Sequence, residues 1–226
     1  MRERFERKLS ELRDDILKMG SMVDEELKLA IEALNAMDED LGQRVYEADK
    51  AVNEMRFSVE EKCFALIVTQ QPAASDLRAI VAVMNMIVDL ERMGDQTKGI
   101  VKVIPHLLKY PNQTQPPELK LMGEKVGNML RDSMTAYAHD DVELAQHVAD
   151  EDDEVDRLYA MVFTSIMEAM AKTKKTHKVE AAYEMLRVGR ELERFGDLAT
   201  NIAERVIYRV EGWIQEVNTD REDTTS

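Results

Sequence analysis

Four pairs of side chains have the types and the spacing to hold a cation. In each pair, two residues with oxygen ligands stand four positions apart, which places both on one face of a helix about one turn from each other. Two carboxylates held that close repel each other, and a bound cation would turn the repulsion into attraction. The pairs are Asp49 and Asn53, Glu91 and Asp95, Asp152 and Asp156, and Glu193 and Asp197.

Spacing alone does not separate a metal site from an ordinary acidic surface. The chain has 45 acidic residues among 226, so roughly nine acidic pairs at this spacing arise by chance. Recurrence of the pairs in both halves of the chain favours a site. So do Gly94 and Gly196, because glycine inside a helical pattern costs about 1 kcal/mol relative to alanine and indicates close approach of a ligand or a neighbouring helix. Arg92 and Arg194 either neutralise the acids or point outward.

The ligand types limit the chemistry. Carboxylates suit magnesium, calcium, manganese or ferric iron, and suit zinc less well. Catalytic di-iron bundles use Glu-x-x-His motifs, which none of the four histidines matches; His147, five residues before Asp152, either approaches that pair or is an exposed helix residue. There is no glycine-rich phosphate loop, no serine–histidine–aspartate pattern and no zinc motif. We therefore expect a protein that is not an enzyme.

Composition indicates an all-α protein. Glycine and proline are few, at 9 and 5 residues, and aromatic residues make up only 5%, which favours helix over strand. The net charge of −15 repels phosphate backbones, so we expect no nucleic-acid partner. The single cysteine, Cys63, excludes an intramolecular disulfide. No signal peptide or membrane span is recognisable, which predicts a cytoplasmic protein without membrane insertion.

The hydrophobic pattern predicts two sets of three helices. One apolar stripe runs from Leu9 to Leu34 and a second from Val45 to Leu66. Pro72 ends the second helix, Ser75 is expected to cap the third, and the third is expected to end near Pro105. The domain prediction is a first three-helix unit at 1–110, a proline-rich linker at 111–117, a second unit at 118–217 and a polar tail at 218–226.

An internal duplication relates the two units. A shift of 103 residues superimposes the apolar positions of the first two helices, and it aligns Asp49 with Asp152 and Cys63 with Ile166. A shift of 102 aligns Leu-Glu-Arg-Met-Gly-Asp at 90–95 with Leu-Glu-Arg-Phe-Gly-Asp at 192–197. The duplication predicts two tandem three-helix bundles, with Cys63 as a buried structural thiol. The second turn differs between them: it is Thr-Gln-Gln-Pro-Ala-Ala-Ser-Asp at 69–76 and Lys-Thr-Lys-Lys-Thr-His-Lys at 172–178. Each is therefore a candidate docking loop or a solvated turn.

Two motifs resemble signatures of the PhoU family. One is Cys-Phe-Ala-Leu-Ile-Val-Thr-Gln-Gln-Pro-Ala-Ala-Ser-Asp-Leu-Arg at 63–78; the other is Asp-Leu-Glu-Arg-Met-Gly-Asp at 89–95, with its echo at 191–197. The resemblance covers nearly the whole chain and implies multinuclear clusters of iron, zinc, manganese, magnesium or calcium. It assigns one cluster to Asp49, Glu91 and Asp95 and the other to Asp152, Asp156, Glu193 and Asp197. Asn53 stands where the family has an acid, so the first site is expected to be weaker.

The resemblance also implies a function. PhoU proteins are negative regulators of phosphate uptake and of phosphate-starvation signalling, and they act as adaptors between the ATPase subunit of a phosphate ABC transporter and a sensor histidine kinase. A homodimer is the expected assembly. Two alternatives from other classes stay open: a carboxylate-bridged metal-storage protein and a metal-dependent enzyme. Turnover with bound metal would identify the enzyme, and loading far beyond two clusters per chain would identify storage.

Overall fold

The computed structural model describes residues 2–110 and 115–212, and these residues form six long helices and one short one. Within this part of the chain there is no strand. The helices are α1 (Arg2–Ala36), α2 (Glu39–Gln70), α3 (Ala74–Val101), α4 (Ile104–Leu107), α5 (Pro117–His139), α6 (Val142–Lys172) and α7 (Thr176–Glu211).

Each bundle starts its second helix in the same way. Asp38 precedes α2 with extended backbone, and its carboxylate accepts hydrogen bonds from the amides of Asp40 (2.9 Å) and Leu41 (3.0 Å). Asp141, its counterpart 103 residues later, caps α6 by accepting from the Leu144 amide at 3.0 Å. Such caps satisfy amides that have no partner within the helix. The duplication therefore extends to the local signals that begin the helices.

The turn between α2 and α3 differs in one respect from the sequence-based prediction. Helix α2 ends at Gln70, and Gln71 adopts a left-handed conformation with φ of 46° ahead of Pro72. The N-cap of α3 is Ala73, without a side-chain cap, so the prediction of Ser75 as the cap is wrong. The helix begins earlier than expected, because the restriction that Pro72 imposes falls on Gln71 before it and leaves the residues after it free to be helical.

The third helix also ends earlier than expected. Helix α3 stops at Val101, and Pro105 lies in the first turn of the separate helix α4. Proline is tolerated there because the first turn of a helix does not use its own amides. Of the predicted linker and tail, residues 111–114 and 218–226 lie outside the described residues.

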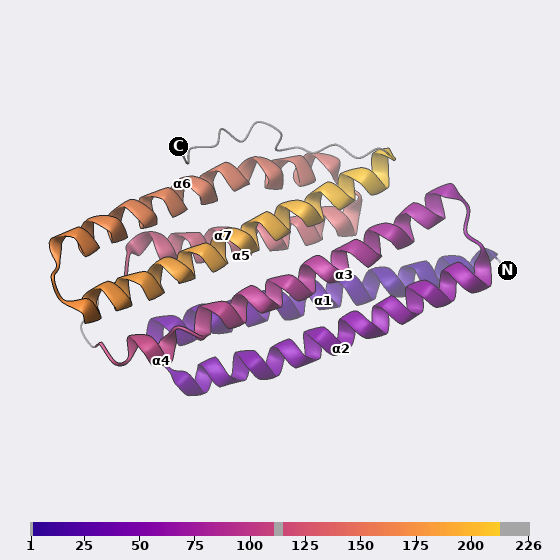
Figure 1. Cartoon of the computed structure of the whole chain (residues 1–226). Helices are drawn as coiled ribbons and strands as arrows, with labels where there is room; N and C mark the ends of the chain where they lie inside the picture. The colour runs from indigo at the N-terminus through magenta and orange to yellow at the C-terminus, as the bar shows by residue number, and fades with distance from the viewer. Residues whose placement is uncertain (1, 111–114, 213–226) are drawn as a thin grey trace.

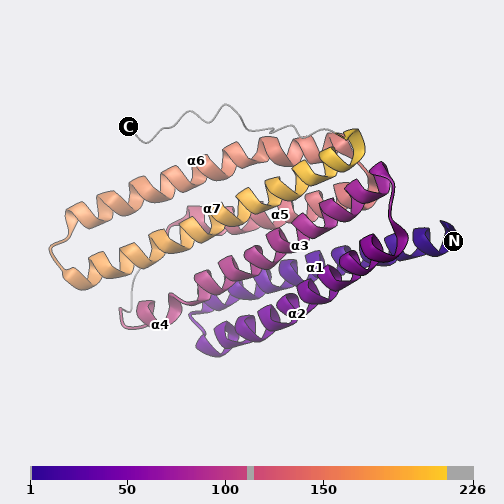
Figure 2. The ribbon, with the colours of Figure 1, turned by 45° about the vertical axis from the view of Figure 1, so that its right-hand side comes forward.

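The two bundles, α1–α3 and α5–α7, lie side by side (Figures 1 and 2). Helices α3 and α7 pack antiparallel: Asp89 in the middle of α3 faces Asn201 of α7, while the Glu191 carboxyl, earlier in α7, lies against Gly99 near the end of α3. Helices α1 and α5 also pack antiparallel, through Ile31 against Gly123. As a result, the α2–α3 turn and the α6–α7 turn lie at opposite ends of the molecule (Figure 1).

The stripes predicted from the sequence form the core. Leu12, Ile16, Met19 and Val23 of α1 are buried, and Cys63 of α2 is buried with them, as expected for a structural thiol. The prediction of an all-α fold made of two tandem three-helix bundles is confirmed. None of the helices in the described part of the chain is both long and apolar enough to cross a membrane.

Candidate functional site

In the first bundle, a lysine stands where a metal ion was expected. The ammonium of Lys98 on α3 donates hydrogen bonds to Asp49 Oδ2 on α2 and pairs with Asp95 Oδ1, each at 2.7 Å. The Asn53 amide donates to the same Asp49 oxygen at 2.8 Å. Asp49 is only 4% exposed. The predicted residues Asp49, Asn53 and Asp95 thus come together around an internal cation.

The environment of Lys98 keeps it charged. Burial by itself would lower the pKa of the ammonium, but the hydrogen bonds from Lys98 to Asp49 and Asp95 outweigh burial and raise the pKa. Arg92 plays no such part, because its side chain is exposed and its nearest acid is Asp89, at 3.9 Å. Of the two roles considered for this arginine, the outward one is therefore correct. Glu91 lies one turn before Asp95 and is half-buried.

Glu26 of α1 belongs to the same cluster, although the sequence analysis did not include it. Its carboxyl group is 1% exposed and accepts a hydrogen bond from the Thr97 hydroxyl, which also contacts the Gly94 carbonyl oxygen at 2.7 Å. Burial raises the pKa of Glu26 to about 8; the hydrogen bond from Thr97 opposes this rise, and the charge of Asp49 adds to it. At neutral pH this carboxyl group therefore holds a proton.

Gly94 makes room for both carboxyl groups. A Cβ atom at this position would lie 2.9 Å from Asp49 Oδ1 and 3.3 Å from Glu26 Oε2. These two oxygens are buried and have no hydrogen-bond partner among the described residues. The glycine noted in the sequence thus has a specific role, because alanine would push against a carboxylate rather than against a flexible apolar group.

A comparison of the two duplicated halves could have identified Glu26 and Lys98 as members of the cluster. Glu26 falls three residues after Val23 on the buried stripe of α1, where an acid is costly. The shift of 103 aligns it with the apolar Met129, and the shift of 102 aligns Lys98 with Thr200. In the folded protein, both Glu26 and Lys98 lie next to Asp49. They are two of the positions at which the two bundles differ in charge.

The second bundle has the same acids in a different setting. Asp152 of α6 is 2% exposed, and Asp156, Glu193 and Asp197 are half-buried. Thr200 of α7 is buried, and its hydroxyl has no hydrogen-bond partner in the described residues. The duplication thus gives this bundle the carboxylates of the first, with a neutral hydroxyl in place of the ammonium.

Acids on the neighbouring surface of α6 do have a lysine. Lys125 of α5 pairs with Glu151 and Glu154, each at 2.6 Å. His147 is exposed and lies 3.7 Å from Glu151. Of the two roles considered for this histidine, that of an exposed helix residue is therefore correct. Across residues 2–110 and 115–212, no three aspartate, glutamate, histidine or cysteine side chains are arranged to hold a metal ion. Coordination by the predicted acids would require their side chains to move.

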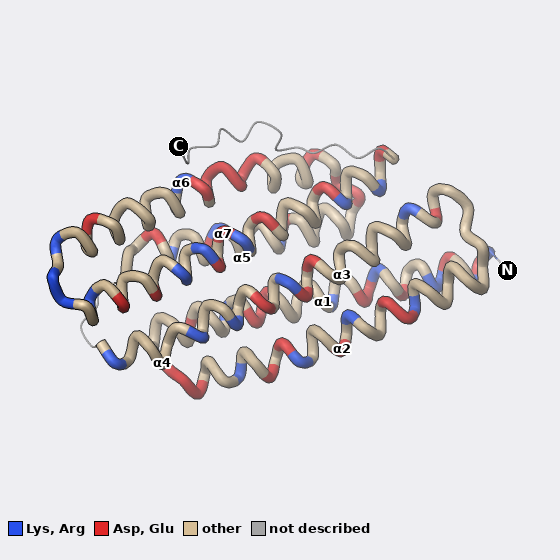
Figure 3. Tube along the Cα trace, viewed as in Figure 1, with Lys and Arg blue, Asp and Glu red and all other residues tan. Residues whose placement is uncertain are grey.

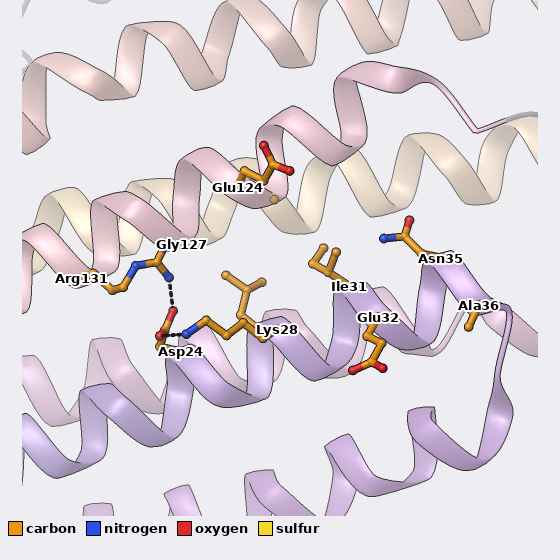
Figure 4. A pocket seen from close by; sticks show the side chains of 11 residues that line it. Asp24, Lys28, Ile31, Glu32, Asn35, Ala36, Glu124, Gly127 and Arg131 are labelled. Carbon is orange, nitrogen blue, oxygen red and sulfur yellow. Dashed lines mark hydrogen bonds and ion pairs between the residues drawn. The ribbon is translucent and has the colours of Figure 1, made fainter.

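A groove marks the junction between the bundles (Figure 4). It runs between α1 and α5 and has a volume of about 630 Å³. At one end Asp24 pairs with Lys28 at 2.6 Å and with Arg131. A Cβ atom on Gly123 would lie 2.9 Å from Ile31 Cδ1, so glycine is required for α5 to pack closely on α1. The groove is therefore part of the contact that joins the bundles.

Comparison with known proteins gives the family. The PhoU domain profile matches this chain twice, at residues 16–104 and 119–206. The chain belongs to the PhoU family. The two matches coincide with the two bundles, so each bundle is one PhoU domain.

Individual PhoU proteins are similar over almost the whole chain. The phosphate-specific transport system accessory protein PhoU homolog of Clostridium acetobutylicum is 36% identical, with 93% of this chain and 96% of the relative covered. PhoU of Escherichia coli K12 is 35% identical, with 92% and 86% covered. The crystal structure of the regulatory protein PhoU from Streptococcus pneumoniae has a TM-score of 0.87 at 30% identity, covering 94% of this chain and 99% of that one. The PhoU structure from Pseudomonas aeruginosa has the same TM-score at 33% identity, covering 92% and 100%.

Proposed function

We propose that this protein is a regulator of phosphate transport that works by binding partners. Its partners would be the ATPase subunit of a phosphate ABC transporter and a sensor histidine kinase, and its effect would be to restrain phosphate uptake and phosphate-starvation signalling. The observation that carries the proposal is the PhoU match across both bundles, together with relatives named as accessory proteins of the phosphate-specific transport system. A homodimer at the cytoplasmic face of the membrane is part of the same proposal.

The site chemistry supports an adaptor. In the first bundle the buried acids are occupied by Lys98, by the Asn53 amide and by a proton on Glu26. Asp49 and Glu26 are also 4% and 1% exposed, so a substrate has little access to either carboxyl group as a general base. The arrangement is what a scaffold requires, since charges buried inside it must be compensated.

The test is a tagged pull-down from cells grown in high and in low phosphate. We expect the wild-type protein to recover the transporter ATPase or the sensor kinase, and deletion of its gene to raise both phosphate uptake and a starvation reporter. Failure to recover either partner in either condition would contradict the adaptor function. Light scattering on the purified protein measures the proposed dimer, and turnover measured with added metal tests the enzyme alternative.

A variant pair separates the role of the second acidic cluster from a simple change of charge. The first variant replaces Asp152, Asp156, Glu193 and Asp197 with alanine. The matched control removes the same number of charges from exposed helix positions that belong to no candidate cluster, namely Glu54, Glu61, Asp150 and Asp153. Loss of partner recovery in the first variant alone would connect the cluster to signalling. Recovery with both variants would assign the cluster a structural role.

We also propose that any metal binds to the second bundle before the first. The argument rests on position: Lys98 and Asn53 already compensate the first set of acids, whereas Thr200 and Asp156 stand at their places in the second. A neutral hydroxyl and an additional carboxylate are both oxygen ligands for a hard cation. The buried hydroxyl of Thr200, which has no hydrogen-bond partner in the described residues, supports this order.

A further inference from the structure

The end of the α6–α7 hairpin is less covered than its counterpart in the first bundle. Helix α1 has 35 residues, whereas α5 has only 23. At about 1.5 Å per residue, α5 is shorter by about 18 Å. In Figure 1 α1 reaches the α2–α3 turn, while the α6–α7 turn projects beyond the start of α5. Among the described residues, the second bundle therefore has two helices at this end where the first has three, and the Tyr110 ring also lies there, stacked on His177 with ring centroids 6.0 Å apart.

A groove lies where the missing helical turns would pack. It has a volume of about 520 Å³ and is bordered by the start of α5, the end of α6 and the start of α7. The shift of 103 aligns Ala169, in the groove, with Leu66; Leu66 is 2% exposed, whereas Ala169 is exposed. Its apolar lining consists of three buried side chains, Ile166, Ala181 and Met185, together with Ala169, which is exposed, and Ala182, which is half-buried.

The first bundle shows what occupies the equivalent place there. The first turns of α1 lie on this end, where Phe5 is buried in the core and Arg2 pairs with Asp76 of α3 at 3.1 Å. The shift of 102 aligns Asp76 with Lys178, which lines the groove of the second bundle. The charge at this position is thus reversed between the bundles. A helix that docks on the second bundle in the same manner would need an acid where α1 has Arg2.

The turn at this end is basic and lies between two acids: Glu168, which pairs with Lys172 at 3.0 Å, and Glu180, which accepts a hydrogen bond from the Tyr110 hydroxyl. Residues 169–179 contain four lysines and no acid, in a chain whose net charge is −15. Figure 3 shows this basic turn at the tip of the α6–α7 hairpin. Exposed apolar side chains lie near it on both helices, including Phe163 and Met167 on α6 and Tyr183 on α7. An apolar lining with a basic rim suits a helix that is apolar on one face and acidic at its edges.

We propose that this groove is a docking site for an acidic amphipathic helix of a partner protein, which completes the second bundle as the first turns of α1 complete the first. The proposal does not depend on the identity of the partner or on metal binding. It rests on three independent features: the shorter α5, the groove beside the exposed Ala169, and the reversal of charge from Asp76 to Lys178.

The test uses the first bundle as the template for the probe. Two fluorescent peptides have the sequence of residues 2–17 of this chain, one with the native Arg2 and one with Arg2→Glu, and both are stapled to hold the helix. Binding to the full-length protein is measured by fluorescence anisotropy at low salt, because salt screens exposed charges. We expect the Arg2→Glu peptide to bind about two- to fivefold more tightly than the native peptide, the range for one exposed ion pair.

Three protein variants make the result specific. Lys178→Asp restores the arrangement of the first bundle and should reverse the order of the two peptides. Ala169→Glu places a charge at the exposed position of the groove lining and should abolish binding of the Arg2→Glu peptide. Lys174→Asp, which makes the same charge change at a lysine outside the groove lining, should keep the original order.

Several outcomes would overturn the proposal. They are binding of neither peptide at millimolar concentration, an order that Lys178→Asp does not reverse, and binding that survives Ala169→Glu. Phosphatidylglycerol vesicles distinguish the other partner that a basic, apolar tip would suit. If the protein binds these vesicles through Lys172 and Lys178 and binds no peptide, the surface recognises a membrane and the docking of a helix is refuted.

Discussion

Replacing Glu26 with glutamine should make the stability of this protein less dependent on pH. The carboxyl group lies in the core of the first bundle, and its pKa is raised from 4.5 to about 8, with burial as the main cause. Between these pH values the folded state holds a proton that the unfolded state has lost. The free energy of unfolding therefore decreases as the pH rises through this interval and levels off above the folded-state pKa.

The size of the effect follows from the difference in pKa. Each unit corresponds to about 1.4 kcal/mol, so the rise from 4.5 to about 8 corresponds to a loss on the order of 5 kcal/mol. Glutamine has nearly the same shape and stays neutral at every pH. The Glu26→Gln variant should therefore match the wild type in acid and exceed its stability above about pH 8 by an amount of this order.

Urea unfolding followed by circular dichroism measures this difference across the pH range, in buffer with a chelator. The diagnostic interval lies between about pH 6 and about pH 8, because burial also raises the pKa of Asp89, to about 6, and this group titrates below the interval. The control is Glu25→Gln, which removes a charge from the exposed neighbouring position. If Glu26→Gln and the wild type show parallel pH profiles in this interval, the carboxyl group is ionised in the folded protein and the reasoning about its burial is refuted.

Three further predictions concern residues at equivalent or interfacial positions. Gly94→Ala should destabilise the protein by about 1–2 kcal/mol, because its Cβ would lie 2.9 Å from Asp49 Oδ1. Gly196→Ala, whose Cβ would lie 3.4 Å from Val126, should be neutral or stabilise the protein by up to about 1 kcal/mol. Thermal unfolding compares the two variants, and equal effects would contradict the role of Gly94. In calorimetric titration, Thr200→Lys should weaken the binding of manganese to the second bundle about tenfold or more, and Lys98→Thr should strengthen its binding to the first. The prediction is wrong if manganese fills the Asp49 site of the wild-type protein first. Burial between α3 and α7 raises the pKa of Asp89 from 3.8 to about 6, although the charges of Arg205 and Arg92 oppose the rise. The wild type should therefore lose stability on the order of 3 kcal/mol as the pH rises from about 4 to about 6, and Asp89→Asn should remove this loss. An unchanged dependence of the unfolding free energy on pH, measured with urea over this range, would count against the prediction.

The helices and their duplication were predictable because they depend on periodicity within single segments. The stripe from Leu9 to Leu34 and the alignment of Cys63 with Ile166 use only local spacing, and both are confirmed by burial in the structure. The prediction of Ser75 as the N-cap of α3 was wrong because it also relied on a local signal alone. Cap preference is a weak local signal, and the backbone around Pro72 decided where α3 begins.

The cluster around Asp49 could be predicted only in part. The acids were visible from their spacing, but Lys98 meets Asp49 across 49 positions of sequence, and Glu26 approaches from a third helix. Which side chain compensates a buried charge depends on how three helices are rotated against one another. Spacing within one helix does not contain that information.

Comparing the two bundles residue by residue supplies part of the information that spacing within one helix lacks, namely which positions differ in charge. Where both have the same residue, as at the glycine of each Glu-Arg-x-Gly-Asp run, the neighbours can still differ: Gly94 lies against Asp49 and Glu26, and Gly196 lies against Val126 and Val155. Where they differ, at Glu26 and Met129, at Lys98 and Thr200, and at Asp76 and Lys178, the fold is held constant and only the charge changes. Each difference must be compensated within its own bundle or by something that binds to it. The first bundle compensates its buried acids with a lysine and a proton, and it covers its hairpin end with α1. We have proposed both the metal site and the docking groove for helices of the second bundle, so this bundle is the half in which binding should be tested first.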